Sequence, residues 1–335
     1  MKKTFIIAEA GINHNGSIHL AKKLINISKK AGADAVKFQT FKAKNVISMY
    51  AKKLSYQKKK NSDKQSQLDM LQSYELSKRN FIELKKYCEK KKIIFMSTPK
   101  DIESASFLNS INMDIFKIGS GEANNYELIK KIYRFNKKTI VSTGMCSLTE
   151  VRKIKNIFSK KKNQLTILHC TSLYPCSIED CNLLSIKFIK DKLKVRVGFS
   201  DHTIGIDASI HAVALGAEVI EKHITLNKDM KGPDHKASLE EKEFKLMVKR
   251  IRVLEKLLGN EKKEPTLLEK RNIKLIRRGL VYNKNFLKGE KIKKNDIGIK
   301  RPMIGLEPDQ KKKIIGKKLN QAVFIDQPIL SKHLN

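Results

Sequence analysis

The chain has 335 residues, of which 40% are hydrophobic and 31% charged, and 70 lysines and arginines against 34 acidic residues give a formal net charge of +36. This length and hydrophobic content allow a large core in one or two domains, which excludes a mainly disordered protein. No apolar run approaches the roughly 20 residues of a membrane helix, and no signal peptide is visible. We therefore expect a cytoplasmic protein that does not enter a membrane.

The cysteines and the basic charge exclude further classes. The five cysteines are odd in number and show no CxxC spacing, so neither a disulfide framework nor a zinc knuckle is indicated. The lysines are spread evenly in short runs such as 58–60 and 311–313. This spacing favours a solvated surface over one nucleic-acid-binding stripe, and the chain lacks tryptophan. We expect no nucleic-acid partner, and a basic nucleic-acid-binding protein remains the weakest alternative.

Eight short apolar segments precede residue 225, and each is too short for a helix. They are residues 5–8, 35–38, 93–96, 115–118, 139–141, 165–168, 195–199 and 219–220. Segments with apolar residues at helical spacing, such as 19–30 and 80–91, lie between them. Continuous apolar strands that alternate with helices indicate a parallel sheet, and eight such units favour a TIM barrel. The predicted fold class is therefore α/β, with a (β/α)8 TIM-barrel catalytic domain over residues 1–258.

The pattern changes after this domain. Residues 259–265 are polar and end in a proline, which predicts a linker over 259–275. Short, turn-bounded segments follow and predict a small β-rich domain over 276–335. A domain of about 60 residues is near the lower limit for independent stability, so we expect it to dock on another surface.

Each predicted strand is followed by polar side chains. In chain order they are Glu9, Lys37 with Gln39, Thr98, Lys117 with Ser120, Ser142, residues 170–174, residues 200–202, and Lys222 with His223. The carboxyl ends of barrel strands converge on one opening, which is where barrel enzymes carry out their chemistry. We therefore predict an active site at this opening.

Two histidines and two acidic residues at these strand ends are candidate metal ligands and proton carriers. His202 and His223 follow successive strands, and Glu9 and Glu122 could lie beside them. Such a mixed nitrogen and oxygen site suits Mn²⁺, Mg²⁺, Fe²⁺ or Zn²⁺ and leaves positions open for substrate. The alternative is a hydrogen-bonded pair of histidines without a metal.

Cations and hydroxyls from other strand ends indicate an anion site. They are Lys37, Thr98, Lys117, Ser120, Ser142 and Ser200. With the small turns at 119–121 and 142–144, these groups suit a phosphate. The alternatives are that the lysines extend into solvent, or that Lys37, Lys117 or Lys222 is the nucleophile of a Schiff-base lysine aldolase. The histidine pair argues against an aldolase, because an imine and a metal are alternative means of activating a carbonyl.

Motifs along the chain resemble the sialic acid synthase family, the bacterial nonulosonate synthases. They include "IIAEAGINHNGS", "AVKFQT", "FMSTP", "FKIGSGEANN", "IVSTGM", "LHCTSLYP", "GFSDHTIG", "VIEKHITL" and "GPDHKASLEE". The tail "GLVYNKNFLKGEKI" resembles the antifreeze-like (SAF) domain that ends those enzymes. The resemblance covers nearly the whole chain.

The resemblance implies a transferase that condenses phosphoenolpyruvate (PEP) with an N-acetylated hexosamine. The sugar would be N-acetylmannosamine or 2,4-diacetamido-2,4,6-trideoxymannose. The products would be phosphate and a nine-carbon 2-keto sugar acid, N-acetylneuraminate or legionaminate. It also implies Mn²⁺ or Mg²⁺ as cofactor and a domain-swapped homodimer.

The resemblance also assigns expected roles to residues of this chain. The metal ligands would be His202 and His223. Apart from the resemblance, Glu9 or Glu122 is our candidate for the catalytic carboxylate that moves a proton. The PEP contacts would be Lys37, Thr98, Lys117, Ser120, Ser142, Ser172 and Ser200. The sugar contacts would be Glu9, Gln39, Tyr174, Asp234 and Arg301, with Arg301 coming from the SAF domain of the other subunit.

The sequence departs from the family pattern at three of the motif positions. Lys100 stands where phenylalanine often follows "STP", Ser172 where some members have asparagine, and Met303 where glycine usually follows "KRP". The first two departures could alter sugar selectivity or a phosphate contact, and the third could shift the loop that presents Arg301. Residues 56–67 with Met70 are more similar to the legionaminate-type synthases than to the pseudaminate-type ones.

Overall fold

The computed structural model describes residues 3–52 and 66–335. Most of the 56–67 stretch compared above therefore lies outside the described residues. The chain divides into two compact units, Met1–Gly259 and Asn260–Asn335. Each unit has its own hydrophobic core.

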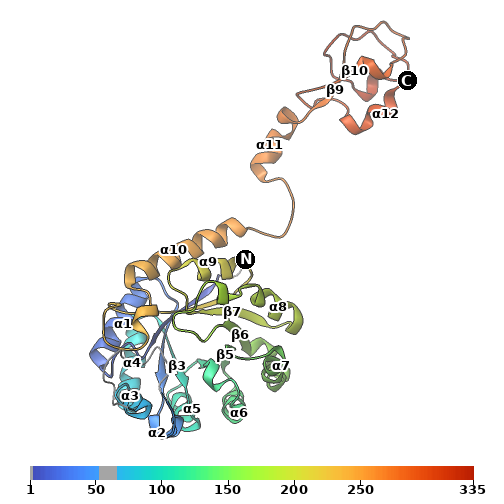
Figure 1. The fold of residues 1–335 in the computed structure, drawn as a ribbon. Helices are drawn as coiled ribbons and strands as arrows, with labels where there is room; N and C mark the ends of the chain where they lie inside the picture. Colours follow the sequence, from blue (N-terminus) through green and yellow to red (C-terminus); the bar gives the residue numbers. More distant parts are fainter. Residues whose placement is uncertain (1–2, 53–65) are drawn as a thin grey trace. The chain divides into compact units, whose positions relative to one another are not determined.

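The first unit is a closed barrel of eight parallel strands in sequential order, which confirms the predicted (β/α)8 fold (Figure 1). The strands are β1 (Phe5–Gly11), β2 (Ala35–Thr40), β3 (Ile94–Pro99), β4 (Ile115–Ile118), β5 (Lys138–Ser142), β6 (Leu165–Cys170), β7 (Arg196–Asp201) and β8 (Val219–His223). The pairing of β8 with β1 closes the ring, and it places Glu9 opposite His223.

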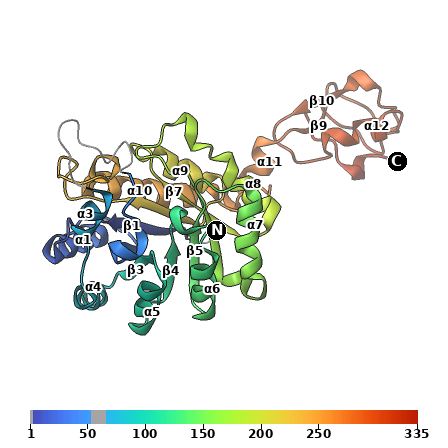
Figure 2. The same cartoon turned by 60° about the horizontal axis from the view of Figure 1, so that its bottom comes forward.

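Helices surround the strands (Figure 2). They are α1 (Ile18–Lys30), α4 (Lys78–Lys91), α5 (Ile102–Ser110), α6 (Tyr126–Arg134), α7 (Leu148–Ile157), α8 (Leu184–Leu193), α9 (Asp207–Ala214) and α10 (Glu241–Leu258), with α2 (Ala43–Val46) and α3 (Gln67–Gln72) between β2 and β3. Serine caps fix several helix starts, because the side chains of Ser17, Ser77 and Ser147 accept backbone N–H groups of the first turn. None of the helices that the structure describes is long and apolar enough to cross a membrane.

Alternation along the strands places the polar strand ends inside the barrel. The layer nearer the amino ends is apolar and consists of Ile7, Ala35, Met96, Ile140, Leu168 and Val219. Side chains on a strand alternate between its two faces, so residues two positions further along share the inner face. These residues are Glu9, Lys37, Thr98, Ser142, Cys170 and Glu221. The apolar layer is therefore the floor beneath a polar layer at the carboxyl ends.

The second unit contains few regular strands. β9 (Gly279–Tyr282) and β10 (Ile297–Lys300) form an antiparallel pair, and its other extended segments meet in isolated bridges such as Phe286 with Val323. The remaining elements are α11 (Leu267–Ile276), α12 (Lys311–Ile314) and the short helices η6 (Lys294–Asp296), η7 (Pro308–Gln310) and η8 (Ser331–His333). Leu280, Tyr282 and Ile329 are in its core.

The segment predicted as a linker, 259–275, is partly helical. Most of α11 (Leu267–Ile276) lies within it. The Thr266 side chain accepts the N–H of Glu269, and the Glu269 carboxylate accepts the N–H of Thr266. This reciprocal capping box starts a helix, and its T-x-x-E spacing is visible in the sequence. The residues of the predicted linker that follow Thr266 are therefore mostly helical, and none of the α11 residues is buried.

His14 is a buried titratable group in the connection between β1 and α1. Its Nδ1 accepts the N–H of Gly16 at 3.1 Å. Burial lowers the pKa of His14 to about 4, from an ordinary value of 6.5. The fold therefore holds this imidazole neutral.

We expect this histidine to weaken the fold in acid. Above about pH 6.5 His14 is neutral in the folded and the unfolded protein, so it does not make the stability depend on pH. As the pH drops from 6.5 towards 4, the unfolded chain binds a proton that the folded chain does not, and the free energy of unfolding falls. His14→Asn keeps an acceptor near the Nδ1 position but does not titrate. Between about pH 7 and about pH 4.5, wild type should lose about 2 kcal/mol more stability than this variant in urea unfolding. Equal losses in the two proteins would contradict the assignment.

Candidate active site

Two lysines and two glutamates form a buried charge cluster at the carboxyl ends of the strands. The Lys37 ammonium on β2 lies 2.7 Å from Glu9 Oε2 on β1 and 3.7 Å from Glu221 Oε2 on β8. The Lys117 ammonium on β4 lies 3.3 Å from Glu221 Oε1. All four side chains are buried. The barrel thus brings together charges from four strands far apart in the sequence.

In this cluster, burial and the neighbouring opposite charges shift the pKa of each group in opposite directions. Burial alone would raise the pKa of Glu221, but Lys117 and Lys37 outweigh it and lower that pKa to about 2. Burial is the largest effect on Lys117 and lowers its pKa despite Glu221. Burial likewise raises the pKa of Glu9, even with Lys37 beside it. Glu221 is therefore the firmly ionised carboxylate, and Glu9 is the one nearer to taking up a proton.

Two hydroxyl groups contact the charge cluster, and a third at a strand end has no partner in the described part of the chain. Lys37 Nζ donates to Thr98 Oγ1 at 3.0 Å, and Ser200 Oγ donates to Glu221 Oε1 at 3.0 Å. Ser142 Oγ is buried and makes no hydrogen bond among the described residues. A buried hydroxyl without a partner is unusual, because native folds pair such groups. This hydroxyl is therefore free to contact a ligand.

The turn after β5 brings its backbone close to serine side chains that follow β4 and β6. The N–H of Gly144 donates to Ser120 Oγ at 3.0 Å. A Cβ at Gly144 would lie 2.9 Å from Ser120 Oγ and 2.3 Å from Ser172 Oγ, so both serines pack against this glycine. Only glycine allows that approach, which places Ser120, predicted after β4, and Ser172, after β6, around one turn.

His202 and His223 face each other with ring centroids 5.6 Å apart. His202 Nδ1 lies 2.7 Å from the carbonyl oxygen of Thr171. A carbonyl only accepts, so Nδ1 carries the hydrogen and Nε2 is left to bind a ligand. Burial lowers the pKa of His223 well below its usual value, with a further contribution from His202. A neutral imidazole is the form that binds metals.

Asp234 and Tyr174 border the histidine pair. Asp234 Oδ2 lies 3.9 Å from His223 Nδ1, and that nitrogen makes no hydrogen bond among the described residues. The Tyr174 ring lies 4.0 Å from the His202 ring, centroid to centroid, and 5.8 Å from the His223 ring. The three rings and the carboxylate therefore form one wall of the opening.

Glu9 and Gln39 join the charge cluster to the histidine pair. Gln39 Nε2 donates to Glu9 Oε1 at 3.2 Å. Gly11, in the left-handed region with a φ of 51°, lies between them and His223. A Cβ there would be 3.3 Å from Glu9 Oε1 and 3.6 Å from His223 Cε1. Glu9 therefore connects the lysines of the charge cluster, through Gln39 and Gly11, to the surroundings of His223.

One predicted residue of the barrel makes no described contact with the histidine pair. Glu122, in the short helix η2 (Ser120–Glu122), turns its carboxylate back towards Gly119, and none of the described hydrogen bonds or ion pairs links it to His202 or His223. Arg301 belongs to the second unit and is exposed there. Glu9 is therefore better placed than Glu122 to act beside the histidines.

Lys222 does not point into the opening, although we predicted it at a strand end. Its ammonium lies 3.0 Å from Asp201 Oδ2 and donates to the Thr203 carbonyl at 2.6 Å. Asp201 also accepts a hydrogen bond from Ser209 on α9, so this ion pair lies between the barrel and its helices. Lys222 is consequently wrong as a candidate Schiff-base nucleophile in this opening.

Two residues of the site were absent from the predicted set. Glu221 is the carboxylate shared by both lysines. Cys170 Sγ lies 3.8 Å from His202 Nδ1. The alternation of β8 could have identified Glu221, because it has the same parity as His223. For Cys170, the available signal was its place at the end of β6.

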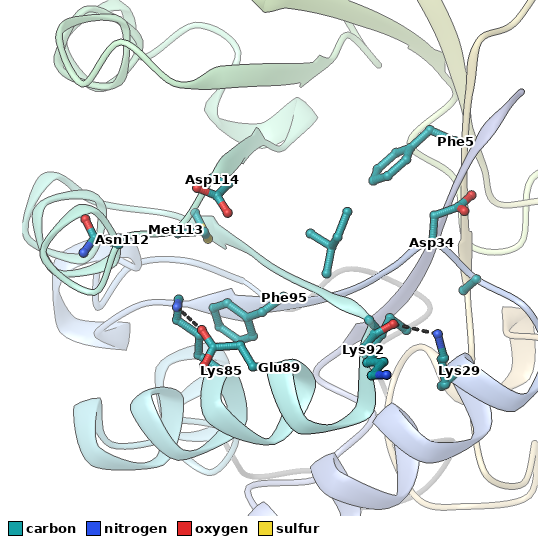
Figure 3. Close-up of a pocket in the computed structure, with 13 residues that line it drawn as sticks. Phe5, Lys29, Asp34, Lys85, Glu89, Lys92, Phe95, Asn112, Met113 and Asp114 are labelled. Atoms are coloured by element: carbon teal, nitrogen blue, oxygen red, sulfur yellow. Dashed lines mark hydrogen bonds and ion pairs between the residues drawn. The ribbon is translucent and has the colours of Figure 1, made fainter. Parts of the chain in front are cut away.

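The structure also has a cavity of about 520 Å³ at the opposite, amino end of the strands (Figure 3). It is bordered by Phe5 at the start of β1, and several of its charged groups have partners: Lys29 donates to the Lys92 carbonyl at 2.6 Å, and Lys85 pairs with Glu89. Barrel chemistry lies at the carboxyl ends, so this cavity is not the candidate active site.

The histidine pair fits a divalent metal with few protein ligands. Metal–nitrogen bonds of about 2.1 Å allow two rings at this separation to bind one ion. Among residues 3–52 and 66–335, no three His, Cys, Asp or Glu side chains form a fuller metal site. A metal held by these two histidines would thus have several coordination positions left for water or substrate. The lysine–glutamate cluster has no net formal charge, so a cation would add the positive charge that an anionic substrate requires.

Comparisons with known proteins agree with the motifs and the fold. N,N'-diacetyllegionaminic acid synthase of Campylobacter jejuni subsp. jejuni serotype O:2 is 48% identical over 320 residues, which cover 95% of this chain and 96% of that protein. The enzyme of the same name from Legionella pneumophila subsp. pneumophila is 39% identical, covering 98% and 94%. The crystal structure of N-acetylneuraminic acid (sialic acid) synthetase from Leptospira borgpetersenii serovar Hardjo-bovis, in complex with citrate, superposes with a TM-score of 0.75 at 34% identity. It covers 81% of this chain and 90% of that one.

Family models match both units of the chain. The NeuB family matches residues 24–263, and the SAF domain matches residues 277–335. These matches follow the order of barrel and small domain that the motifs indicated. The chain belongs to the NeuB family, the sialic acid synthase family that its motifs resemble.

Proposed function

We propose that this protein is a nonulosonate synthase that condenses PEP with an N-acetylated amino sugar, with N,N'-diacetyllegionaminate as the favoured product. The observation that supports the proposal is the buried pairing of Lys37 and Lys117 with Glu221, with the unpartnered Ser142 hydroxyl and the His202–His223 pair also at the carboxyl ends of the strands. A phosphate ester and a carbonyl are the two groups that such a site suits. The names of the C. jejuni and L. pneumophila relatives favour the legionaminate product.

The bond changes follow from the two substrates. C3 of PEP forms a bond to the aldehyde carbon of the open-chain sugar, and the aldehyde oxygen takes up a proton. Water adds to C2 and loses a proton, and the C2–O bond to phosphate breaks. The products are a 2-keto acid and inorganic phosphate, so no oxidant or reductant is needed.

Lys37 and Lys117 would hold the phosphate during this sequence. Both ammonium groups are buried, where an ionic contact is stronger than in water. Thr98, Ser142 and Ser200 would add hydroxyl contacts, and Ser120 and Ser172 would line the turn at Gly144. Holding the departing phosphate stabilises the charge that develops as the C–O bond breaks.

His202 and His223 would hold a Mn²⁺ or Mg²⁺ ion, which when bound supplies Lewis-acid polarisation of the sugar aldehyde. Glu9 would accept a proton from the water that adds to C2, because burial raises its pKa and so favours proton uptake. Gln39 would orient Glu9 through the hydrogen bond between them.

The sugar would lie on the side of the opening formed by Tyr174, Asp234, Gln39 and Glu9. These groups offer an aromatic face, two carboxylates and an amide, which suits a polyhydroxy amide. Arg301 would complete the site from the SAF domain of a second subunit in a domain-swapped homodimer. Size measurement in solution and activity of mixed His223→Ala and Arg301→Ala subunits would test this arrangement.

The function is tested by phosphate release from PEP in the presence of Mn²⁺ and either N-acetylmannosamine or 2,4-diacetamido-2,4,6-trideoxymannose. We expect release with the diacetamido sugar, loss of release with excess chelator and recovery with added Mn²⁺. A Schiff-base aldolase would resist chelator and be inactivated by borohydride with substrate. Trapping by borohydride, or no phosphate release with either sugar, would contradict the proposal.

A further inference from the structure

The loop between β8 and α10 carries Asp234, and its two ends are joined. Ile224 and Leu239 form a bridge, and the N–H of Leu239 donates to the His223 carbonyl at 2.9 Å. The N–H of Thr225 donates to the Leu239 carbonyl at 2.9 Å. Residues 226–238 therefore form a loop that leaves the strand end and returns to it, and contacts from elsewhere in the chain can fix its position.

Asn13, in the connection between β1 and α1, supplies such a contact. Its Nδ2 donates to the Ile224 carbonyl and to Ser238 Oγ, both at 2.9 Å. Ser238 Oγ in turn donates to the Asp234 carbonyl at 2.7 Å. All three side chains, Asn13, Ser238 and Asp234, are buried. A continuous chain of hydrogen bonds thus runs from Asn13 to the backbone of Asp234.

The orientation of the Asn13 amide is fixed by its partners. The Ile224 carbonyl only accepts, so the NH₂ group must face it, and Asn13 Oδ1 is left buried without a hydrogen bond among the described residues. Both amide hydrogens are used on this loop. Aspartate has the same shape but offers neither hydrogen, so it cannot replace asparagine here.

His223 is held independently of Asn13. It pairs with Glu9 in the β1–β8 register, and the N–H of Ile224 donates to the Glu9 carbonyl at 2.9 Å. The Leu239 N–H also holds the His223 carbonyl. Loss of the Asn13 contacts therefore leaves His223 on its strand but removes one of the restraints on Asp234, whose neighbour His235 is also held by Thr225 and Asn15.

We infer that Asn13 is a positioning residue that fixes Asp234 beside His223 and thereby sets the affinity for the amino sugar. The inference rests on the proposed function, because it takes Asp234 as a sugar contact. The candidate PEP contacts, such as Lys117 and Ser142, come from other strands that Asn13 does not touch. Asn13 should therefore act on the sugar and spare PEP.

The test is Asn13→Asp, with Ser238→Ala as a second variant that breaks the same chain. We expect Asn13→Asp to raise the KM for 2,4-diacetamido-2,4,6-trideoxymannose at least about tenfold, with the KM for PEP and the half-activating Mn²⁺ concentration within about twofold. Calorimetric titration of the same sugar without PEP should show the matching loss of affinity. The double variant should lose little more than Asn13→Asp alone, because both changes break one chain.

The matched control is Ser28→Ala, which removes a buried hydrogen bond from Ser28 Oγ to the Leu24 carbonyl within α1. It should lower the melting temperature and leave both KM values unchanged. Equal rises in both KM values for Asn13→Asp, or unchanged sugar affinity in both variants, would overturn the inference and leave the proposed function intact. A wild-type protein that neither binds the sugar nor releases phosphate would overturn both.

Discussion

His223→Ala is expected to lower kcat at least about 10³-fold while the protein stays folded. The ring is one of two imidazoles that face each other, and its Nδ1 makes no hydrogen bond among the described residues. Its loss would leave a single nitrogen donor for the metal, so the aldehyde would lose its polarising group. The measurement is kcat over a wide range of Mn²⁺ concentrations, together with thermal unfolding.

His211→Ala is the matched control for this variant, because His211 is exposed on α9. It should keep wild-type kcat. If His223→Ala retained more than about a tenth of wild-type kcat at saturating Mn²⁺, the role of the histidine pair would be refuted.

Lys117→Met is expected to lower kcat/KM for PEP about 10²- to 10³-fold and to leave the KM for the sugar nearly unchanged. Lys117 is buried and would face the phosphate, whereas the proposed sugar contacts come from other strands and loops. Among the described residues, the substitution also leaves Lys37 as the one ammonium group paired with Glu221, which should lower stability.

A double variant separates these two effects. Lys117→Met with Glu221→Gln removes one positive and one negative charge, so it should recover stability without recovering PEP turnover. Lys222→Met with Asp201→Asn removes an equally buried pair outside the opening and should leave the KM for PEP unchanged. Recovery of PEP turnover in the first double variant would contradict a direct phosphate contact by Lys117.

The barrel could be predicted because its signal is local. Short apolar strands and amphipathic helices recur in the sequence. Parallel barrel strands bring their carboxyl ends together regardless of the conformation of the loops. This reasoning placed Glu9, Lys37, Lys117, His202 and His223 at one opening, and the structure brings them there.

The errors and omissions have identifiable causes. We predicted a strand over 219–220, but β8 extends to His223, so alternation turns Glu221 and His223 inwards and Lys222 outwards. The pairing of Glu221 with both lysines depends on ring closure, which strand-by-strand prediction does not contain. The approach of Asp234 to His223 likewise depends on Asn13, more than 200 residues away in the sequence.

The central claim is that PEP is cleaved at its C–O bond as a new carbon–carbon bond forms. The most direct test uses PEP labelled with ¹⁸O at the bridging oxygen, incubated with the protein, Mn²⁺ and 2,4-diacetamido-2,4,6-trideoxymannose. We predict that all of the label appears in inorganic phosphate and that a nine-carbon 2-keto acid forms in equal amount. Label retained in the organic product, or phosphate released without a nine-carbon acid, would contradict the account.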